Sequence, residues 1–417
     1  MAEARTPRIP GVDPLDLVDP ERFARNGYPH AVWTRLRAEA PVARFAPPGF
    51  RPFWAITKHA DIVDISSQPL RFSNAYGITL AAADQPMVPI RSEMIVMLDP
   101  PRHRPVRKLA SPRFTPRAVR AHDADVERIA VEILDQAATG GATSECDFVE
   151  RIAAPLPIAV ISWILGVPRE DWKLLYRWTN EVIGASDPEF QRPGETPAQT
   201  ARRARRELHI YLERLIERRR SDPGDDLVSE LLDAELDGAP VPLDLLLQNF
   251  ELFVEAGNET TRNAISGGLL AFCEHRGEWE RLRARPELLP QAVEEIVRWV
   301  TPIIYFTRVA TEDCEVRGEK IRAGEQLALY YASANRDEEV FDDPFEFRID
   351  RRPNRHLAFG IGEHVCLGAH LARVELETIF RHLLGRLEAF ELSGPVERLS
   401  SAVNGGIKHL PLRYRLA

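Results

Sequence analysis

The stretch of sequence that decides the fold reads Phe359-Gly360-Ile361-Gly362-Glu363-His364-Val365-Cys366-Leu367-Gly368. Three glycines in ten residues predict a tight loop, because glycine alone enters left-handed and closely packed backbone conformations at little cost. Residues 369–384 follow and read as an amphipathic helix, whose positive N-terminal end favours the anionic form of the Cys366 sulfur. Such a loop can hold the sulfur still with backbone N–H groups directed at it, which suits an axial metal ligand.

Three other roles for Cys366 remain open from these residues alone. A lone cysteine in an intracellular chain is often a small buried hydrophobic residue. A nucleophilic cysteine needs a histidine base placed by the fold, and His364, two residues away, points elsewhere on an extended loop. Zinc needs three or four ligands, and no CxxC or HxxxH set accompanies this cysteine. The loop itself favours the metal-ligand role.

The composition indicates a globular protein. The chain has 417 residues, of which 44% are hydrophobic and 28% charged, which is enough material for a core. A net charge of −9 argues against nucleic acid as a partner. Four scattered cysteines give no disulfide framework and fit a reducing compartment. The first 20 residues contain no apolar run, and other apolar stretches are too short to span a bilayer, so we expect a cytoplasmic protein without a membrane anchor.

Helical periodicity dominates the chain. We expect helices over residues 29–40, 61–67, 118–138, 153–165, 169–183, 201–220, 243–275, 289–300 and 369–384. Short strands are expected at 53–57, within 304–329 and at 410–416. Residues 72–98 read as a long irregular loop and residues 187–200 as a mobile connection. No linker divides the chain, so we expect one domain over residues 1–417, mainly α with small β-sheets.

The long helix carries Ala256-Gly257-Asn258-Glu259-Thr260-Thr261 in its middle. Glycine inside a helix costs about 1 kcal/mol relative to alanine, so Gly257 indicates a kink or a close contact. An acid followed by a hydroxyl beside it can open the helical hydrogen bonds and hold water. The alternative is a packing glycine with ordinary polar residues on a solvated face.

Two further motifs carry charge. Glu295 and Arg298, three residues apart, share one helix face and can pair, although such a pair on the surface contributes little. A basic cluster lies in an otherwise acidic chain, and a solvated face is the usual reason for a charge run. Its members are Arg102, Arg104, Arg107, Lys108, Arg113 and Arg117.

The cysteine loop resembles the haem-binding loop of the cytochrome P-450 superfamily, in its soluble bacterial type, with no gap and with every glycine of the pattern. The stretch 256–261 resembles the oxygen-activation motif of that family. Glu295, Arg298 and Arg351 resemble its buried Glu-Arg network, which would lock the coil that presents Cys366. The resemblance implies the cytochrome P-450 fold, with the long central helix over the haem and the cysteine loop beneath it.

The same resemblance implies roles for individual residues. The cofactor would be haem b, iron protoporphyrin IX, with Cys366 as the axial ligand of the iron. Thr260 would hydrogen-bond dioxygen and Glu259 would pass protons towards it. The other cofactor contacts, including the cations that meet the propionates, would be His103, Arg107, Ala256, Gly257, Arg308, Phe359, Gly360, His364 and Gly368.

The implied reaction is hydroxylation, in which one atom of O2 is inserted into a C–H bond of a lipophilic steroid, terpenoid or fatty-acyl substrate. A thiolate ligand favours cleavage of the O–O bond. Electrons would come from NAD(P)H through ferredoxin reductase and a ferredoxin docked on Arg102, Arg104, Lys108, Arg113 and Arg117. A peroxide-driven haem peroxygenase and a non-catalytic haem sensor are the alternatives.

The segments that line the substrate pocket in this family carry mostly apolar side chains here, as a lipophilic ligand requires. The expected wall consists of Tyr76, Ile78, Leu80, Met87, Val88, Met94, Val182, Phe253, Ile303, Ile304, Tyr305 and Val403.

Overall fold

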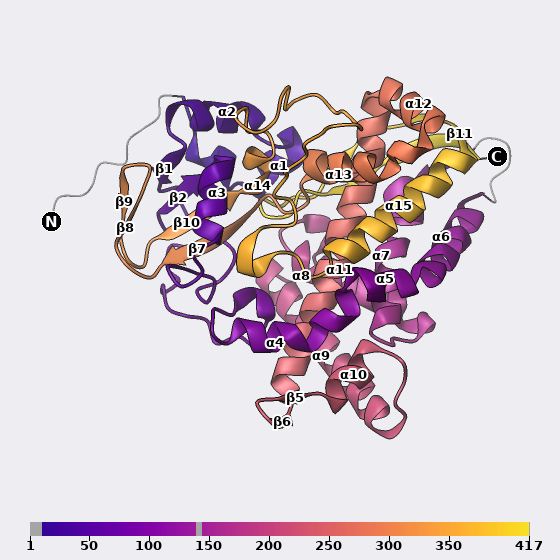
Figure 1. Cartoon of the computed structure of the whole chain (residues 1–417), viewed down its shortest axis with the longest axis horizontal. Helices are drawn as coiled ribbons and strands as arrows, with labels where there is room; N and C mark the ends of the chain where they lie inside the picture. Colours follow the sequence, from indigo (N-terminus) through magenta and orange to yellow (C-terminus); the bar gives the residue numbers. More distant parts are fainter. Residues whose placement is uncertain (1–10, 139–143, 417) are drawn as a thin grey trace.

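The computed structural model describes residues 11–138 and 144–416. Helices make up the larger part of the molecule and small sheets the remainder (Figure 1). The helices are α1 Pro20–Asn26, α2 His30–Glu39, α3 His59–Ser66, α4 His103–Ala110, α5 Pro116–Ala121, α6 Asp123–Ala137, α7 Pro155–Ile164, α8 Trp172–Ile183, α9 Pro197–Ser221, α10 Leu227–Asp233, α11 Leu243–Glu274, α12 Arg276–Ala284, α13 Leu289–Val300, α14 Tyr331–Ala334 and α15 Ala369–Arg386.

The strands form one larger sheet and several small ones. They are β1 Val42–Phe45, β2 Phe53–Ile56, β3 Phe72–Ser73, β4 Ser144–Asp147, β5 Glu235–Leu236, β6 Ala239–Pro240, β7 Tyr305–Ala310, β8 Cys314–Val316, β9 Glu319–Ile321, β10 Gln326–Tyr330, β11 Leu387–Leu392, β12 Glu397–Arg398, β13 Ile407–His409 and β14 Pro411–Leu416. The five-stranded sheet has the order β1-β2-β10-β7-β3, with β10 parallel to β2 and antiparallel to β7. This pairing joins early and late parts of the chain.

The two faces of this sheet belong to two separate apolar clusters. Side chains alternate along a strand, so Phe53 and Ala55 face one cluster while Trp54 and Ile56 face the other. The first cluster continues into α1 and α2 and also contains Tyr305 and Tyr330. A third and larger cluster fills the helical part of the molecule.

The helix α11 forms the axis of the helical part. Its 32 residues span roughly 48 Å, and in Figure 1 it passes behind α4, α5 and α15 and in front of the paler α7 and α8. A Cβ atom at Gly257 would lie 3.0 Å from Ile161 of α7, and one at Gly268 would lie 2.8 Å from Ile296 of α13. The helix is unbroken at Gly257, so the glycine indicates a close contact and no kink.

Several expected helices differ at their ends for reasons that are visible in the backbone. The helix expected at 118–138 is two helices, because His122 leaves the helical conformation between α5 and α6. The helix α9 begins four residues earlier than expected, at Pro197, after a capping box formed by Thr196 and Gln199. Helices α10 and α12 were not predicted from periodicity.

The segment 187–200 is more firmly held than its polar composition predicted. The buried Asp187 accepts hydrogen bonds from the backbone N–H of Ser400 at 2.9 Å and from Lys408 Nζ at 3.2 Å. Arg192 donates to Glu181 of α8 and to Glu207 of α9, at 3.0 and 2.8 Å. Distant charged residues thus hold this segment at Asp187 and at Arg192, which its polar composition did not predict.

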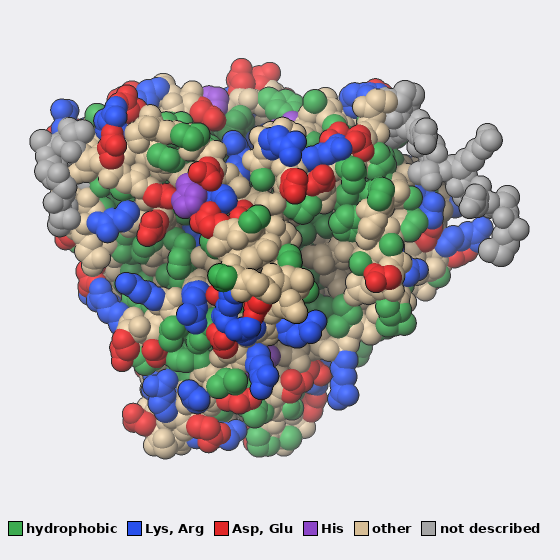
Figure 2. Space-filling view, turned by 180° about the vertical axis from the view of Figure 1, so that it is seen from behind, with side chains coloured by type: hydrophobic (Ala, Val, Ile, Leu, Met, Phe, Trp, Pro, Cys, Tyr) green, Lys and Arg blue, Asp and Glu red, His purple; other side chains and the backbone are tan. Residues whose placement is uncertain are grey.

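Charge is mixed on the surface. Figure 2, which views the molecule from behind, shows acidic and basic side chains interspersed around a hollow near the centre of that face, with neither sign gathered into a large patch. Within residues 11–138 and 144–416, none of the helices combines the length and apolar character that crossing a bilayer requires.

Candidate functional site

The cysteine loop folds back on itself immediately before α15. The backbone N–H of Cys366 donates to the carbonyl of Phe359 at 2.8 Å, and that of Gly360 donates to Leu357 at 2.9 Å. Gly360 and Gly362 have positive φ angles of 67° and 78°. A Cβ atom at Gly362 would lie 2.5 Å from the carbonyl oxygen of Ser66, so only glycine allows α3 to approach the loop this closely.

The environment of the Cys366 sulfur acts on its ionisation in two directions. Burial of the sulfur among protein atoms is the larger effect and raises its pKa. The backbone N–H of Gly368 hydrogen-bonds the sulfur, and Arg107 and Arg373 lie near it, and all three oppose the rise. The residue nevertheless keeps accessible surface and lines a cavity of about 490 Å³ between α4, the loop and α15. The cavity borders Cys366 on the side where Arg107, Phe359 and Arg373 lie.

Arg373 and Glu294 support the loop from behind and were not predicted from the sequence. Arg373 donates to both oxygens of Glu294, at 2.6 and 2.9 Å, and its guanidinium carbon lies 4.5 Å from the centre of the Phe359 ring. Burial opposes ionisation of Glu294, but hydrogen bonds from His356 and Arg373 outweigh it and hold its pKa at about 2. No local spacing marks this pair, because 79 residues separate its members.

Two histidines meet on one side of the loop. The rings of His103, at the start of α4, and His364 lie with their centres 4.4 Å apart. Burial is the main cause that lowers the pKa of both, to about 3 for His364, so both are neutral at pH 7. Among the described residues, neither Nε2 atom has a hydrogen-bond partner, although both are buried. Buried nitrogen atoms without a partner are available to a ligand. Because His103 Nδ1 faces the Glu363 carboxylate at 3.2 Å, its Nε2 can donate to an anionic group only when the ring is protonated, whereas the neutral ring of His364 can carry its proton on Nε2.

Two arginines from the predicted set lie in the same region. Arg308 of β7 is 4% exposed and donates to the carbonyl of Thr307 at 2.8 Å. It has no ion-pair partner in the described part of the chain. Arg107 of α4 donates to the carbonyl of Val365 at 2.7 Å, which ties α4 to the cysteine loop. Arg308 is thus a buried cation with donor groups available to a ligand.

The middle of α11 presents a small, accessible surface. Ala256 is exposed and Thr260 is partly exposed, although the helix is otherwise buried here. The Thr260 hydroxyl donates to the Ala256 carbonyl at 2.8 Å. This bond places a hydroxyl beside a residue without a bulky side chain, where a ligand can approach the helix.

The carboxylate of Glu259 is directed away from the Thr260 hydroxyl. Its side chain is 3% exposed, forms an ion pair with Arg262 and accepts a hydrogen bond from Asn263 Nδ2 at 3.0 Å. Arg262 in turn donates to Asn180 of α8 at 2.7 Å. The structure therefore brings Glu259 to a buried cation and does not bring its carboxylate to the Thr260 hydroxyl.

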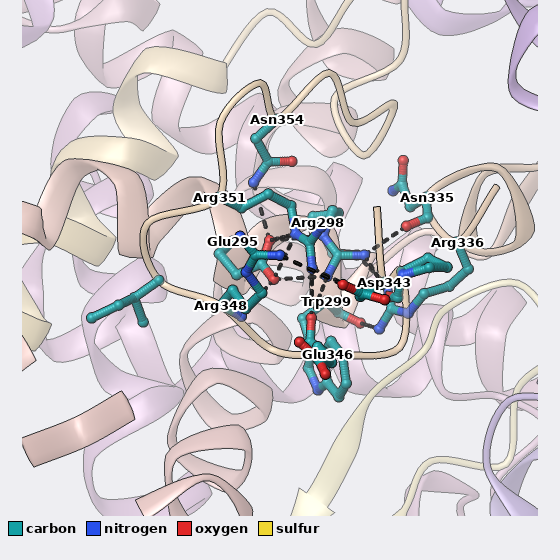
Figure 3. Close-up of polar contacts among 12 residues, drawn as sticks. Glu295, Arg298, Trp299, Asn335, Arg336, Asp343, Glu346, Arg348, Arg351 and Asn354 are labelled. Atoms are coloured by element: carbon teal, nitrogen blue, oxygen red, sulfur yellow. Dashed lines mark hydrogen bonds and ion pairs between the residues drawn. The ribbon is translucent and has the colours of Figure 1, made fainter. Parts of the chain in front are cut away.

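Glu295, Arg298 and Arg351 come together in a buried network (Figure 3). Arg298 donates to both oxygens of Glu295 at 2.7 Å, and Arg351 Nε lies 3.2 and 3.1 Å from the same two oxygens. The remaining guanidinium groups donate to backbone carbonyls of residues 335 to 346. The network thus fastens α13 to the coil that leads into the cysteine loop.

Part of the expected substrate wall is core. Ile304 has no exposed surface and Tyr305 is 3% exposed, and both belong to the cluster that contains Trp33 and Tyr330. The structure places Ile304, which directly precedes β7, and Tyr305 of β7 in the apolar cluster shared with the N-terminal helices. Leu80 lies in this cluster and Val403 packs against it. Phe253 is buried in the large helical cluster and Val88 is 55% exposed. The assignment of the wall residues stays a prediction.

The basic cluster is largely paired. Arg102 pairs with Glu93, Arg104 with Glu363, and Arg113 with Asp225 and Glu230. The Arg113 side chain is 12% exposed. Lys108 and Arg117 are exposed, and the described residues give them no ion-pair partner. The expected docking face thus has fewer uncompensated charges than the sequence indicated.

The chain is similar to known proteins over nearly its whole length. A family model described as Cytochrome P450 matches residues 49–402. The chain is 36% identical over 411 residues to linalool 8-monooxygenase of Pseudomonas putida, covering 95% of this chain and 97% of that protein. It is 39% identical over 414 residues to steroid C26-monooxygenase of Mycobacterium tuberculosis, covering 96% and 92%. A Mycobacterium marinum cytochrome P450 solved in complex with pseudoionone superposes with a TM-score of 0.88 at 35% identity, covering 97% and 99%.

Proposed function

The chain belongs to the cytochrome P450 family, and we propose that it hydroxylates a terpenoid, steroid or fatty-acyl substrate with one oxygen atom taken from O2. The family makes the protein a haem-thiolate monooxygenase with the P450 fold, as the cysteine loop predicted. The observation that carries the proposal is the Cys366 sulfur, held in the glycine loop and hydrogen-bonded by the backbone N–H of Gly368.

The residues present fit a haem. Its propionates would meet the unpartnered Nε2 atoms of His103 and His364, the buried Arg308 and the neighbouring Arg107. Its iron would be held by Cys366, with Phe359, Gly360 and Gly368 shaping the loop around the sulfur. When bound, the haem iron supplies the oxygen-activating chemistry that amino-acid side chains lack, with the thiolate favouring O–O cleavage.

Residues of α11 would control protons and space at the reacting centre. Ala256 and Gly257 leave room at the helix surface, and the Thr260 hydroxyl beside them would hold and transfer a proton. Glu259 would supply that proton from the protein interior. Because its carboxylate is bound to Arg262, we propose that it must exchange this partner for Thr260 or a water molecule in each cycle.

The names of the relatives support the substrate class. One is named for linalool, one for a steroid, and one was solved with pseudoionone. All three compounds are lipophilic, as is the predicted wall of this chain, including Phe253, Ile303 and Met94. The terpenoid and steroid classes are accordingly the preferred substrates, ahead of fatty acyl chains.

The remaining roles follow from the same premise. The Glu295, Arg298 and Arg351 network would have a structural function, which is to hold the coil that presents Cys366. Electrons would pass from NAD(P)H through ferredoxin reductase to a ferredoxin on the α4 side, steered mainly by Lys108 and Arg117. We further propose that residues 1–417 form one domain and act in the cytoplasm.

The test is turnover by the haem-loaded protein. With NADH, ferredoxin reductase, ferredoxin and a terpenoid and steroid panel, we expect shifts of the haem Soret band and a product that carries labelled oxygen from O2. Product formed only with hydrogen peroxide would favour the peroxygenase instead. Full function of Thr260→Ala would favour a haem sensor, and a silent panel would overturn the substrate class.

A further inference from the structure

The accessible part of α11 includes a glutamate that neither the oxygen chemistry nor the packing explains. Between Asn249 and Ser266, only Leu252, Glu255, Ala256, Gly257 and Thr260 keep accessible surface. Four of them, Leu252, Glu255, Ala256 and Thr260, have the spacing i, i+3, i+4 and i+8 and therefore share one helix face. Glu255 lies at one edge of this accessible face and Thr260 at the other, about 140° apart around the helix axis.

The surroundings of Glu255 do not satisfy its carboxyl group. Glu251, one turn earlier, bonds to Arg205 and His209, the two basic side chains that α9 presents here. Glu255 has no ion pair within the described residues, and its Oε1 atom is buried without a hydrogen-bond partner. Unpaired buried polar atoms are costly and rare, so one on the accessible face of α11 points to a ligand.

The same surroundings keep this carboxyl uncharged. Burial, the nearby Glu251 charge and a hydrogen bond with Glu251 raise the pKa of Glu255 to about 8, against the opposing effect of Arg205. The charged and titratable groups around it are Glu251, Arg205 and His209, with Glu259 and Arg262 one to two turns further along. At neutral pH the group is mostly protonated, so its unpartnered Oε1 can accept a hydrogen bond from a ligand, and its O–H can donate to a ligand oxygen that replaces Glu251 as the acceptor.

We propose that Glu255 is the specificity-determining residue of the substrate pocket and hydrogen-bonds one hydroxyl or carbonyl oxygen of an otherwise apolar, uncharged substrate. This rests on the proposed function, which places the substrate over the face of α11 that carries Thr260. A free fatty acid fits less well, because its carboxylate would be buried beside Glu255 with the nearby cations already paired to Glu251.

The position of Glu255 also bears on where the substrate carries its oxygen. Thr260 lies five positions after Glu255, which is roughly 7.5 Å along the helix axis. The recognised oxygen is then remote from the carbon that is oxidised. A cyclic or branched lipophile of about ten carbons or more, with an alcohol or ketone at the end far from the reacting carbon, has this arrangement.

The probes are menthol, menthone and p-menthane, which share one carbon skeleton and differ only in the oxygen function. Dissociation constants come from titration of the haem Soret band. Glu255→Leu removes the polar group, and we expect the ratio of the menthol to the p-menthane dissociation constant to rise about 3- to 10-fold, the effect of one neutral hydrogen bond. Glu255→Gln retains a donor and an acceptor and should keep the wild-type ratio.

A pH series gives an independent test that does not depend on the folding of the leucine variant. Between pH 7 and pH 9 the wild-type carboxyl loses its proton and can no longer donate to a ketone. We expect menthone binding to weaken about 3- to 10-fold over this range in the wild type and to stay constant in Glu255→Gln. Menthol, which can donate to a carboxylate, should keep its affinity in both.

The control is Glu274→Gln, which makes the same change at the last residue of α11 and should leave every ratio unchanged. An unchanged menthol to p-menthane ratio in Glu255→Leu, or equal pH dependence of menthone binding in the wild type and Glu255→Gln, overturns the proposal. If the wild type binds none of the three probes, both the role of Glu255 and the proposed substrate class are refuted. A wild type that binds and oxidises them with unchanged ratios refutes only the role of Glu255.

Discussion

Two buried carboxyl groups of this molecule, Glu295 beneath the cysteine loop and Glu255 on the accessible face of α11, have opposite surroundings. Glu295 receives hydrogen bonds from Arg298, Arg351, Asn354 and the backbone N–H of Arg348, so each of its oxygens is bonded more than once. Glu255 has a buried oxygen with no partner among the described residues. A buried charge whose hydrogen bonds are all satisfied holds a structure in one arrangement, whereas a buried carboxyl oxygen without a partner is available to a ligand.

The largest effect should come from removing the Glu295 carboxylate, whose hydrogen bonds are all satisfied. Glu295→Ala leaves the guanidinium groups of Arg298 and Arg351 buried without their carboxylate, so we expect a loss of about 3–5 kcal/mol in the free energy of unfolding and weaker haem retention. Denaturant unfolding and haem loss to apomyoglobin would measure it. Glu287→Ala, in the exposed pair with Arg285, is the control and should leave unfolding unchanged. If Glu295→Ala lowers the free energy of unfolding by less than about 1 kcal/mol, the network does not stabilise the fold.

The second prediction concerns the hydroxyl on the accessible face. Thr260 makes its hydrogen bond only to Ala256 of its own helix, so Thr260→Ala should leave the unfolding midpoint nearly unchanged. It should divert most NAD(P)H consumption from product to peroxide or water, because proton delivery to dioxygen is lost. The ratio of product formed to NADH consumed measures this. Thr260→Ser, which retains the hydroxyl, should keep most of the coupling.

The third prediction uses pH to separate the two carboxyl groups. The pKa of Glu255 is raised from 4.5 to about 8, so the folded protein holds this proton more tightly than the unfolded chain. Its contribution to stability is complete below pH 4.5 and falls as the pH rises towards 8, by at most about 1.4 kcal/mol per pH unit. Glu255→Gln should lack this fall. If the free energies of unfolding of the wild type and Glu255→Gln change in parallel between pH 5 and pH 9, this prediction is wrong.

The smallest effect concerns charges outside both regions. Lys108→Glu and Arg117→Glu change exposed side chains, so we expect slower reduction by ferredoxin, by several-fold at low ionic strength and less in high salt. Stopped-flow reduction kinetics at two salt concentrations would measure it, with substrate binding as the control. Arg113→Glu is a poorer choice, because it would break pairs with Asp225 and Glu230. Rates that do not depend on salt would argue against docking here.

Local patterns predicted the elements of the site well and their surroundings poorly. The cysteine loop, α11, α13 and α15 were expected within a few residues of where they lie, because each is specified by spacing within one segment. The confirmed P450 fold follows from these segments and their order along the chain. Glu255 was not singled out from the sequence, because a helical pattern does not show what packs against each face.

The sequence by itself determined the chemistry of Cys366, since a loop of glycines and the start of a helix act on a sulfur within a few residues. Tertiary structure alone decided which charges are paired. Arg373 pairs with Glu294, and Arg205 and His209 bond to Glu251, across elements that are distant in the sequence. Ile304 and Tyr305 are buried in the core. The physical reason is that burial and ion pairing depend on residues far apart in the chain, and no spacing within one segment records them.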